Sequence, residues 1–174
     1  MLRPLTALAA ALCLTATAQA GMDDFKPGTL VPSFGKSAAV EGFTLPEDAV
    51  FKVAFDVSEG APDGDVNKGF NTAARFLNMH AAAGVPAENM SVAIVVHGPA
   101  ASDLLTDAKL GRANPSAPLV AELIAAGASI QLCGQTAAAR DFAPEDLLPG
   151  VTVSLSAMTA HALLQQDGYT LNPF

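Results

Sequence analysis

The chain contains little cysteine, few basic residues and only one long apolar run. Its 174 residues include two cysteines, and nine Lys and Arg stand against seventeen Asp and Glu, which gives a formal net charge of −8. This acidic surplus argues against nucleic acid and anionic membranes as partners. The apolar run lies at residues 5–18, and no later segment is long enough to span a bilayer.

Common catalytic and cofactor motifs are also absent. The sequence contains no G-x-S-x-G, no H-E-x-x-H, no Walker loop and no G-x-G-x-x-G. It contains no C-x-x-C, which excludes thioredoxin-type dithiol exchange. Cys133 and the histidines do not have the spacing of metal ligands, so neither a metal nor another cofactor is expected. His80 and His161 fall in predicted helices and are interpreted as surface or packing residues.

Residues 1–20 have the pattern of a secretory signal peptide. Arg3 supplies a positive charge, the apolar run follows, and Ala18-Gln19-Ala20 forms a small-x-small cleavage site before Gly21. The run is too short to cross a membrane as a stable helix. We therefore expect an exported protein, in a bacterial periplasm, with no membrane association after cleavage.

Export would leave one cysteine in the mature chain. Cys13 lies within the signal peptide, so Cys133 alone would remain and no internal disulfide could form. A single thiol in an oxidising compartment is either well buried or kept for chemistry. Composition alone leaves both interpretations open.

The rest of the chain divides into an irregular arm and one domain. Residues 21–49 are rich in proline and glycine, and we expect them to lie over the domain through Phe25, Phe34 and Phe43. Residues 50–174 alternate apolar strands with helical patterns. The predicted strands are 50–57, 91–96, 129–133, 150–155 and 169–171. This alternation predicts a three-layer α/β/α domain with a mainly parallel five-stranded sheet.

Four of the predicted strands end at polar or reactive residues, namely Asp56, His97, Cys133 and Ser156. Because the carboxyl ends of parallel strands share one edge, where ligands bind, these residues form a candidate site. The helical run expected from Ala137 would favour the thiolate of Cys133 through its N–H groups. Each residue has a structural alternative. Asp56 can solvate a loop, His97 can bond a backbone carbonyl, Ser156 can cap a helix and Cys133 can act as a small hydrophobe.

Two glycines and a glutamine complete the candidate site. Gly98 and Gly134 directly follow His97 and Cys133, so no neighbouring side chain blocks a small ligand there. We therefore assign catalysis to Cys133 and His97. The substrate-binding candidates are Asp56, Gly98, Gly134, Gln135 and Ser156.

Six segments share their pattern with one known family. They are FDV at 55–57, ARFLN at 74–78, VVHGPA at 95–100, LCGQ at 132–135, SAMTA at 156–160 and GYTLNPF at 168–174. As an ordered set they cover nearly all of the chain after residue 20, and the chain resembles an exported member of the DsrE/DsrF-like family. The resemblance implies a parallel three-layer α/β fold and homo-oligomers, often trimers or hexamers.

The resemblance also implies a role for Cys133. In the characterised cytoplasmic branch of the family, a cysteine at a comparable strand end carries sulfur as a persulfide, and Cys133 is the matching position. His97 belongs to a motif of the exported branch only, so the cytoplasmic branch implies no role for it. The leading hypothesis is a periplasmic sulfur-handling protein, sulfurtransferase-like if it turns over. Its partner would be a small sulfur-containing molecule or a sulfur-acceptor protein.

An alternative remains open. The protein could be a non-catalytic oligomeric module for ligand binding or assembly, in which Cys133 is structural. The sequence does not decide whether it is an enzyme.

Overall fold

The domain is built on a five-stranded parallel sheet. A computed structural model describes residues 21–172, and the strands lie in the order β4-β3-β2-β1-β5. The predicted mainly parallel five-stranded α/β sheet is therefore confirmed. The strands are β1 (Phe51–Val57), β2 (Met90–Val96), β3 (Ser129–Cys133), β4 (Thr152–Ser154) and β5 (Thr170–Asn172).

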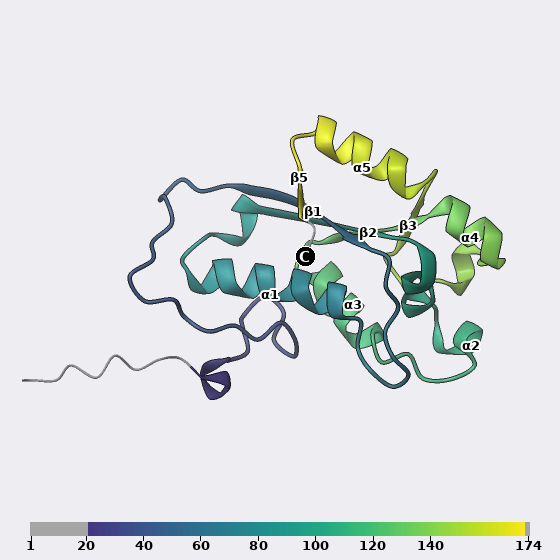
Figure 1. Cartoon of the computed structure of the whole chain (residues 1–174), viewed down its shortest axis with the longest axis horizontal. Helices are drawn as coiled ribbons and strands as arrows, with labels where there is room; N and C mark the ends of the chain where they lie inside the picture. The colour runs from purple at the N-terminus through teal and green to yellow at the C-terminus, as the bar shows by residue number, and fades with distance from the viewer. Residues whose placement is uncertain (1–20, 173–174) are drawn as a thin grey trace, which may run out of the picture.

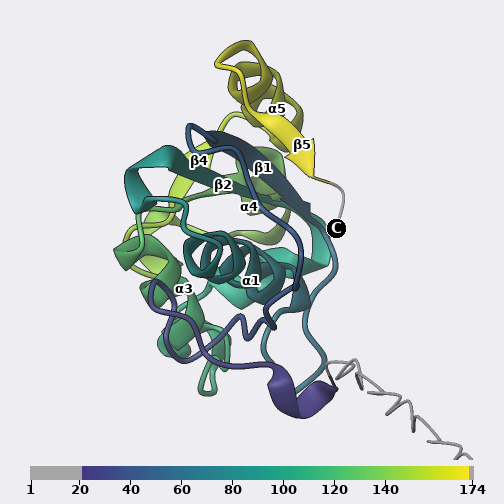
Figure 2. The same ribbon diagram turned by 90° about the vertical axis from the view of Figure 1, so that its left-hand side faces the viewer.

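Helices cover both faces of this sheet. Helices α1 and α3 lie on one face and α5 lies on the other, which gives three layers (Figures 1 and 2). Within residues 21–172, no helix has both the length and the apolar character needed to cross a membrane. The helices are α1 (Lys68–Ala82), α2 (Asp107–Leu110), α3 (Ala117–Ala125), α4 (Gly134–Arg140) and α5 (Ala157–Gln166), with short 3-10 turns η1 (Met22–Asp24), η2 (Ala87–Asn89), η3 (Gly98–Leu104) and η4 (Pro144–Asp146).

The helix after Cys133 begins earlier than the sequence suggested. The helical run was expected from Ala137, but α4 starts at Gly134 and Cys133 is its N-cap residue. The strand and the helix therefore meet at the cysteine without an intervening turn, and the first N–H groups of α4 follow the thiol directly.

The two faces of the sheet differ in the size of their side chains. Successive side chains of a strand point to opposite faces. On β1, Phe55 packs into the main core with α1 and α3, whereas Ala54 and Asp56 face the other way. Ala54, Ala93 and Ala160 of α5 are almost fully buried outside that core. Three alanines, together with Val95, therefore lie between α5 and the sheet.

The N-terminal segment, residues 21–49, is mostly irregular and is held to α1 by hydrogen bonds with Asn71, Arg75 and the buried Asn78. Asn78 is 1 % exposed, and its Oδ1 accepts the N–H of Val31 at 3.0 Å. Its Nδ2 donates to the carbonyl oxygens of Val31 and Phe34 at 2.9 Å each. Phe34 is half-buried against the core, while Phe43 remains 64 % exposed. The segment thus lies on the α1 side of the sheet, away from α5 (Figure 2).

Replacing Asn78 tests this attachment. Asn78→Ala would leave the buried N–H and C=O of Val31 without partners, so we expect the free energy of unfolding to fall by about 3 kcal/mol. We also expect faster proteolysis within residues 21–49. Chemical denaturation and limited proteolysis measure both effects. Thr72→Ala, on the exposed side of α1, is the control and should change neither; equal behaviour of the two variants would contradict the assignment.

Candidate functional site

The strand register brings three of the predicted residues to one corner of the sheet. Val96 of β2 pairs with Leu132 of β3, so the next residues, His97 and Cys133, lie on neighbouring strands. The backbones of such strands are about 4.8 Å apart. Asp56 pairs with Val95 on the other side of β2. Because side chains alternate along each strand, Asp56, His97 and Cys133 all face α5.

These residues line one pocket at the carboxyl edge. Its volume is about 280 Å³, and Cys133, although only 6 % exposed, forms part of its wall. Five of the seven candidate residues line the pocket, whereas Gly98 and Gly134 do not. The lining residues are Asp56, His97, Cys133, Gln135, Thr136, Ser156, Ala157, Met158 and His161.

The two glycines contribute through the backbone instead. Gly98 has φ +57°, and its N–H donates to Oγ1 of Thr136 at 3.2 Å. A Cβ at Gly134 would lie 2.5 Å from the carbonyl oxygen of Ser154, so glycine is what allows β3 and β4 to approach there. Gly98 and Gly134 therefore shape the backbone around the pocket and do not line it.

Ser156 both borders the pocket and caps α5. Its Oγ accepts the N–H of Thr159 at 3.0 Å, as the structural alternative anticipated. Gln135 donates from Nε2 to the carbonyl oxygen of Leu155 at 3.2 Å. These two bonds fix the start of α5 beside α4.

Asp56 holds two imidazole rings. Nε2 of His161 lies 2.8 Å from its carboxylate, and Nε2 of His97 lies 3.2 Å from it. Burial raises the pKa of Asp56, but hydrogen bonds from His161 and His97 outweigh it, so the pKa is lowered overall. Asp56 is therefore ionised at neutral pH.

The ionised carboxylate of Asp56 determines which ring nitrogen of each histidine carries the proton. A carboxylate only accepts hydrogen bonds, so the Nε2 of each ring must donate to it. In a neutral imidazole, Nδ1 is then the basic nitrogen. Nδ1 of His97 makes no hydrogen bond to any residue within 21–172, and the His97 side chain is 34 % exposed. This nitrogen of His97 belongs to a side chain on the same side of the sheet as Cys133.

The surroundings of Cys133 favour its thiolate. Burial raises the pKa of the thiol, but hydrogen bonding from the N–H and the hydroxyl of Thr136, and from the N–H groups of Ala157 and Gln135, outweighs it. The pKa therefore lies below the ordinary thiol value. The first residues of α4 and α5 supply these N–H groups, so two helix starts converge on one sulfur.

Sequence reasoning missed two polar side chains at the site, those of His161 and Thr136. The interpretation of His161 as a surface or packing residue is wrong, because it binds Asp56. One signal was available: Ala157 and His161 are four residues apart on a helix that begins at the sheet edge, so both face the same way. Thr136 gave no signal. His80, by contrast, packs against aromatic rings as expected, with its centroid 4.5 Å from that of Phe51.

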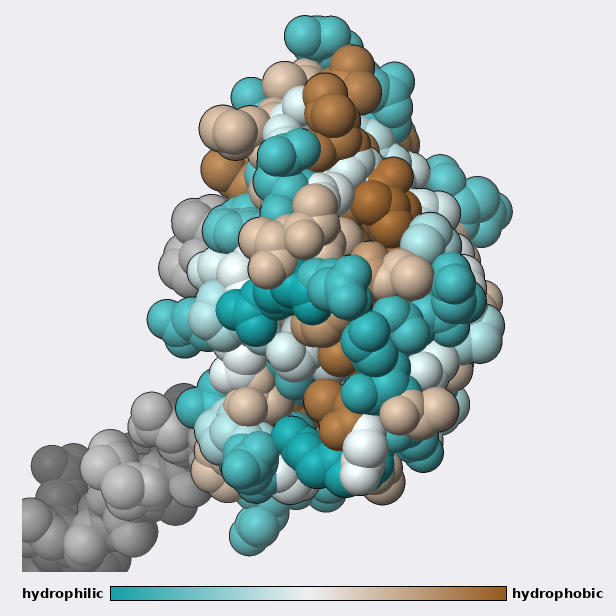
Figure 3. Space-filling model, turned by 90° about the vertical axis from the view of Figure 1, so that its right-hand side faces the viewer, coloured by the Kyte–Doolittle hydropathy of each residue, from teal (hydrophilic) through white to brown (hydrophobic). Residues whose placement is uncertain are grey.

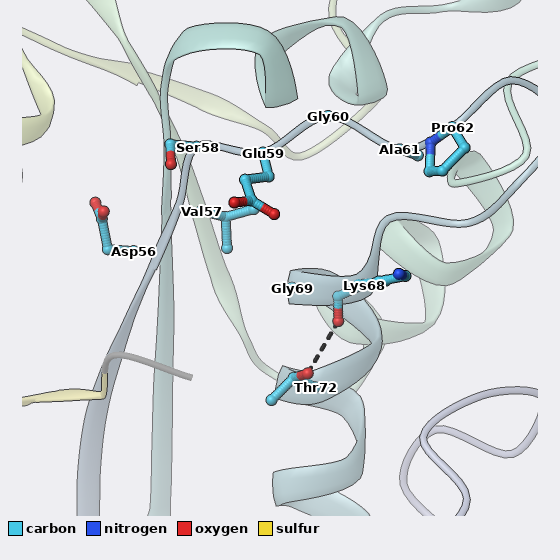
Figure 4. Close-up of a pocket in the computed structure, with 10 residues that line it drawn as sticks. All are labelled: Asp56, Val57, Ser58, Glu59, Gly60, Ala61, Pro62, Lys68, Gly69 and Thr72. Carbon is cyan, nitrogen blue, oxygen red and sulfur yellow. Dashed lines mark hydrogen bonds between the residues drawn. The ribbon is translucent and has the colours of Figure 1, made fainter.

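A larger cavity lies on the other side of β1. It has a volume of about 520 Å³ and is bordered by the loop after β1 and the start of α1. Figure 4 shows Glu59, Lys68 and Thr72 around it, with Asp56 set apart across the strand. Its lining contains no thiol and no imidazole. The smaller pocket contains both groups, from Cys133 and from His97 and His161, so we place the candidate chemistry there.

The donors at the smaller pocket do not form a metal site. Among residues 21–172, no group of three or more His, Cys, Asp or Glu side chains is arranged to hold a metal ion. The pairing of both histidines with Asp56 directs their Nε2 atoms at the carboxylate instead.

Within residues 21–172, the structure is of one class: a parallel α/β domain that carries a single thiol at the carboxyl edge of its sheet. The chain belongs to the DsrE/DsrF-like family, whose model matches residues 52–173. Membership associates this fold with sulfur relay. No curated protein matches the chain.

Two solved structures share the fold. A protein of unknown function, MTH1491 from Methanobacterium thermoautotrophicum, is 20 % identical with a TM-score of 0.56, over 71 % of this chain and 99 % of that one. The ychN protein from E. coli is 18 % identical with a TM-score of 0.52, over 71 % of this chain and 100 % of that one. At these identities the likeness concerns the fold alone.

Thr136 provides a test of the thiolate environment. Thr136→Val removes the hydroxyl near Cys133, so the thiol pKa should rise and alkylation at pH 7 should slow by about fivefold, the equivalent of one hydrogen bond. Iodoacetamide rates measured across pH report both effects. Thr136→Ser keeps the hydroxyl and should match the wild type. Equal profiles for the Val and Ser variants would show that the hydroxyl of Thr136 does not lower the pKa of the Cys133 thiol.

Proposed function

We propose that the protein is an exported sulfur-handling protein that carries sulfane sulfur as a persulfide on Cys133. The observation that supports this most is the pocket itself, because Cys133 lines a cavity and is surrounded by groups that lower its pKa. A nucleophilic cysteine needs a thiolate and access for its substrate. The pocket and the hydrogen bonds to the sulfur support both requirements at this corner of the sheet.

The proposed chemistry is balanced without an outside oxidant. The Cys133 thiolate attacks the outer sulfur of a donor such as thiosulfate, and a new S–S bond forms as the donor's S–S bond breaks. Sulfite leaves with the electron pair. An acceptor thiolate then attacks the outer sulfur of the persulfide, which returns the Cys133 thiolate and moves one sulfur atom to the acceptor.

His97 and the helix starts have defined parts in these steps. When Cys133 begins as a thiol, Nδ1 of His97 takes its proton, because Nε2 is already committed to Asp56. The N–H groups at the starts of α4 and α5 stabilise the thiolate and the developing negative charge of the persulfide. We assign contact with the donor to Gln135 and Ser156, which line the pocket wall.

The proposed location and partners rest on features of the sequence. The signal-peptide pattern at residues 1–20, which lies outside the described residues, supports export to a periplasm. The partners we propose are a small sulfur-containing donor and a sulfur-acceptor protein. A net charge of −8 supports neither nucleic acid nor an anionic membrane as a partner.

The alternative of a binding or assembly module has one observation in its favour. Cys133 is only 6 % exposed, as a structural cysteine would be. The two functions differ in the reactivity of the native thiol. A structural cysteine reacts with alkylating agents only after unfolding, whereas a sulfur carrier reacts in the folded protein.

Sulfur loading tests the proposed function directly. Purified protein exposed to thiosulfate or polysulfide should release up to about one sulfur per chain to cyanide, because one thiolate carries one outer sulfur. Cys133→Ser should release none. His97→Gln should load more slowly, since it lacks the base. Absence of label on the wild type, or equal label on Cys133→Ser, would refute the persulfide.

An uncharged surface beside the pocket supports self-association. Residues 147–166, which include β4 and α5, contain no Asp, Glu, Lys or Arg. Leu155, Met158 and Leu163 are 71 %, 80 % and 61 % exposed. Figure 3 shows apolar surface gathered at the upper part of this side of the molecule, where α5 lies. Copies of an acidic chain repel each other least where charge is absent, so we propose a homo-oligomer formed through this surface.

A charge substitution on each of two apolar surfaces tests this interface. Leu163→Glu on α5 should lower the oligomer to smaller species in sedimentation velocity, because it buries a charge in the contact. Val40→Glu, at a 69 % exposed position on the N-terminal segment, is the matched control and should sediment as the wild type. If only Val40→Glu dissociates the oligomer, the interface lies on the N-terminal segment and not on α5.

A further inference from the structure

His161 makes the shortest contact in the pocket yet has no place in the proposed sulfur chemistry. It lies on α5 rather than at a strand end, and its Nε2 is 2.8 Å from Asp56, against 3.2 Å for His97. The side chain of His161 is 15 % exposed, whereas those of Asp56 and His97 are 38 % and 34 % exposed. The more buried ring therefore holds the carboxylate more closely.

The second nitrogen of His161 cannot serve a substrate. Nδ1 is buried and has no hydrogen-bond partner in the part of the chain that the structure describes. Nε2 donates to Asp56, so neither nitrogen of His161 is open to a donor or acceptor of sulfur. The contact with Asp56 is the polar function that remains for this ring.

This contact restrains Asp56. The carboxylate is more than a third exposed, and its rotation about χ2 would otherwise be broad. A bond from His161 on one side leaves the carboxylate facing His97 on the other. The ring of His97 is then fixed by its Nε2, and its Nδ1 keeps no hydrogen-bond partner within residues 21–172.

We infer that His161 is a positioning residue, which holds Asp56 so that His97 keeps its Nε2–H tautomer and presents Nδ1 as the base for Cys133. The role of His97 as a base rests on the proposed function, but the arrangement of the two histidines around Asp56 does not. The chain of contacts joins α5 to β1 and to the end of β2, so the helix that bears the apolar surface also orders the pocket.

The tautomers can be read directly because the chain has three histidines. In ¹⁵N spectra of side-chain imidazoles at pH about 8, where a free imidazole is neutral, His97 and His161 should show the Nε2–H form. His80 is an internal reference, since its Nδ1 lies 2.8 Å from the carbonyl oxygen of Phe76 and must donate to it. His161→Leu should give His97 a mixture of tautomers and leave His80 unchanged.

His161→Gln is the conservative rescue. Its amide can donate to Asp56 as the imidazole does, so His97 should regain the Nε2–H form. Sulfur loading should slow by on the order of tenfold in His161→Leu and recover in His161→Gln, because the loss acts through the base. If His161→Leu does not fold, His161→Met replaces it, since methionine also fills the site without donating a proton.

The outcomes separate this inference from the proposed function. Unchanged His97 tautomers in a folded His161→Leu or His161→Met variant would overturn the positioning role, even if sulfur loads normally. Failure of the wild type to load sulfur would refute the persulfide function, while a tautomer change in the same variants would still support the arrangement. Loss of loading with no rescue by His161→Gln would also count against the positioning role.

Discussion

The parallel register of β1, β2 and β3 is the constraint on which the pocket depends. Val57 pairs with Val96 and Val96 pairs with Leu132, so three strands end at nearly one level. Because the side-chain period of a strand is two, a shift of one residue would send Cys133 to the opposite face. The apolar alternation that fills the core against α1 is therefore also what turns the reactive residues toward α5.

The second determinant is the close approach of α5. Besides Val95, the residues buried between the two layers include Ala54 and Ala93 on the sheet and Ala160 on the helix, which are all small. The first turn of α5 can then bring the N–H of Ala157 to Cys133, and the next turn brings His161 to Asp56. Larger residues in this layer would lift the helix and separate both contacts, so the small core on this side serves the site as well as the fold.

The fold and much of the pocket could be predicted from local patterns. Apolar strands alternating with helices fixed a parallel sheet, and the residues at strand ends fixed Asp56, His97 and Cys133 at its carboxyl edge. The helical residues were harder. The pocket face of α5 depends on how the helix docks, and Thr136 became significant only because α4 begins at Gly134 rather than near Ala137. Such docking is set by contacts between distant segments, which no local pattern contains.

The fastening of the N-terminal segment has a practical consequence. Asn78 holds Val31 on the α1 side of the sheet, and residues 21–30 lie on that side, opposite α5 (Figure 1). A fusion partner, an affinity handle or a surface linker joined ahead of Gly21 would therefore extend away from the Cys133 pocket. Immobilised through that end, the protein would present the thiol edge and α5 to the solution.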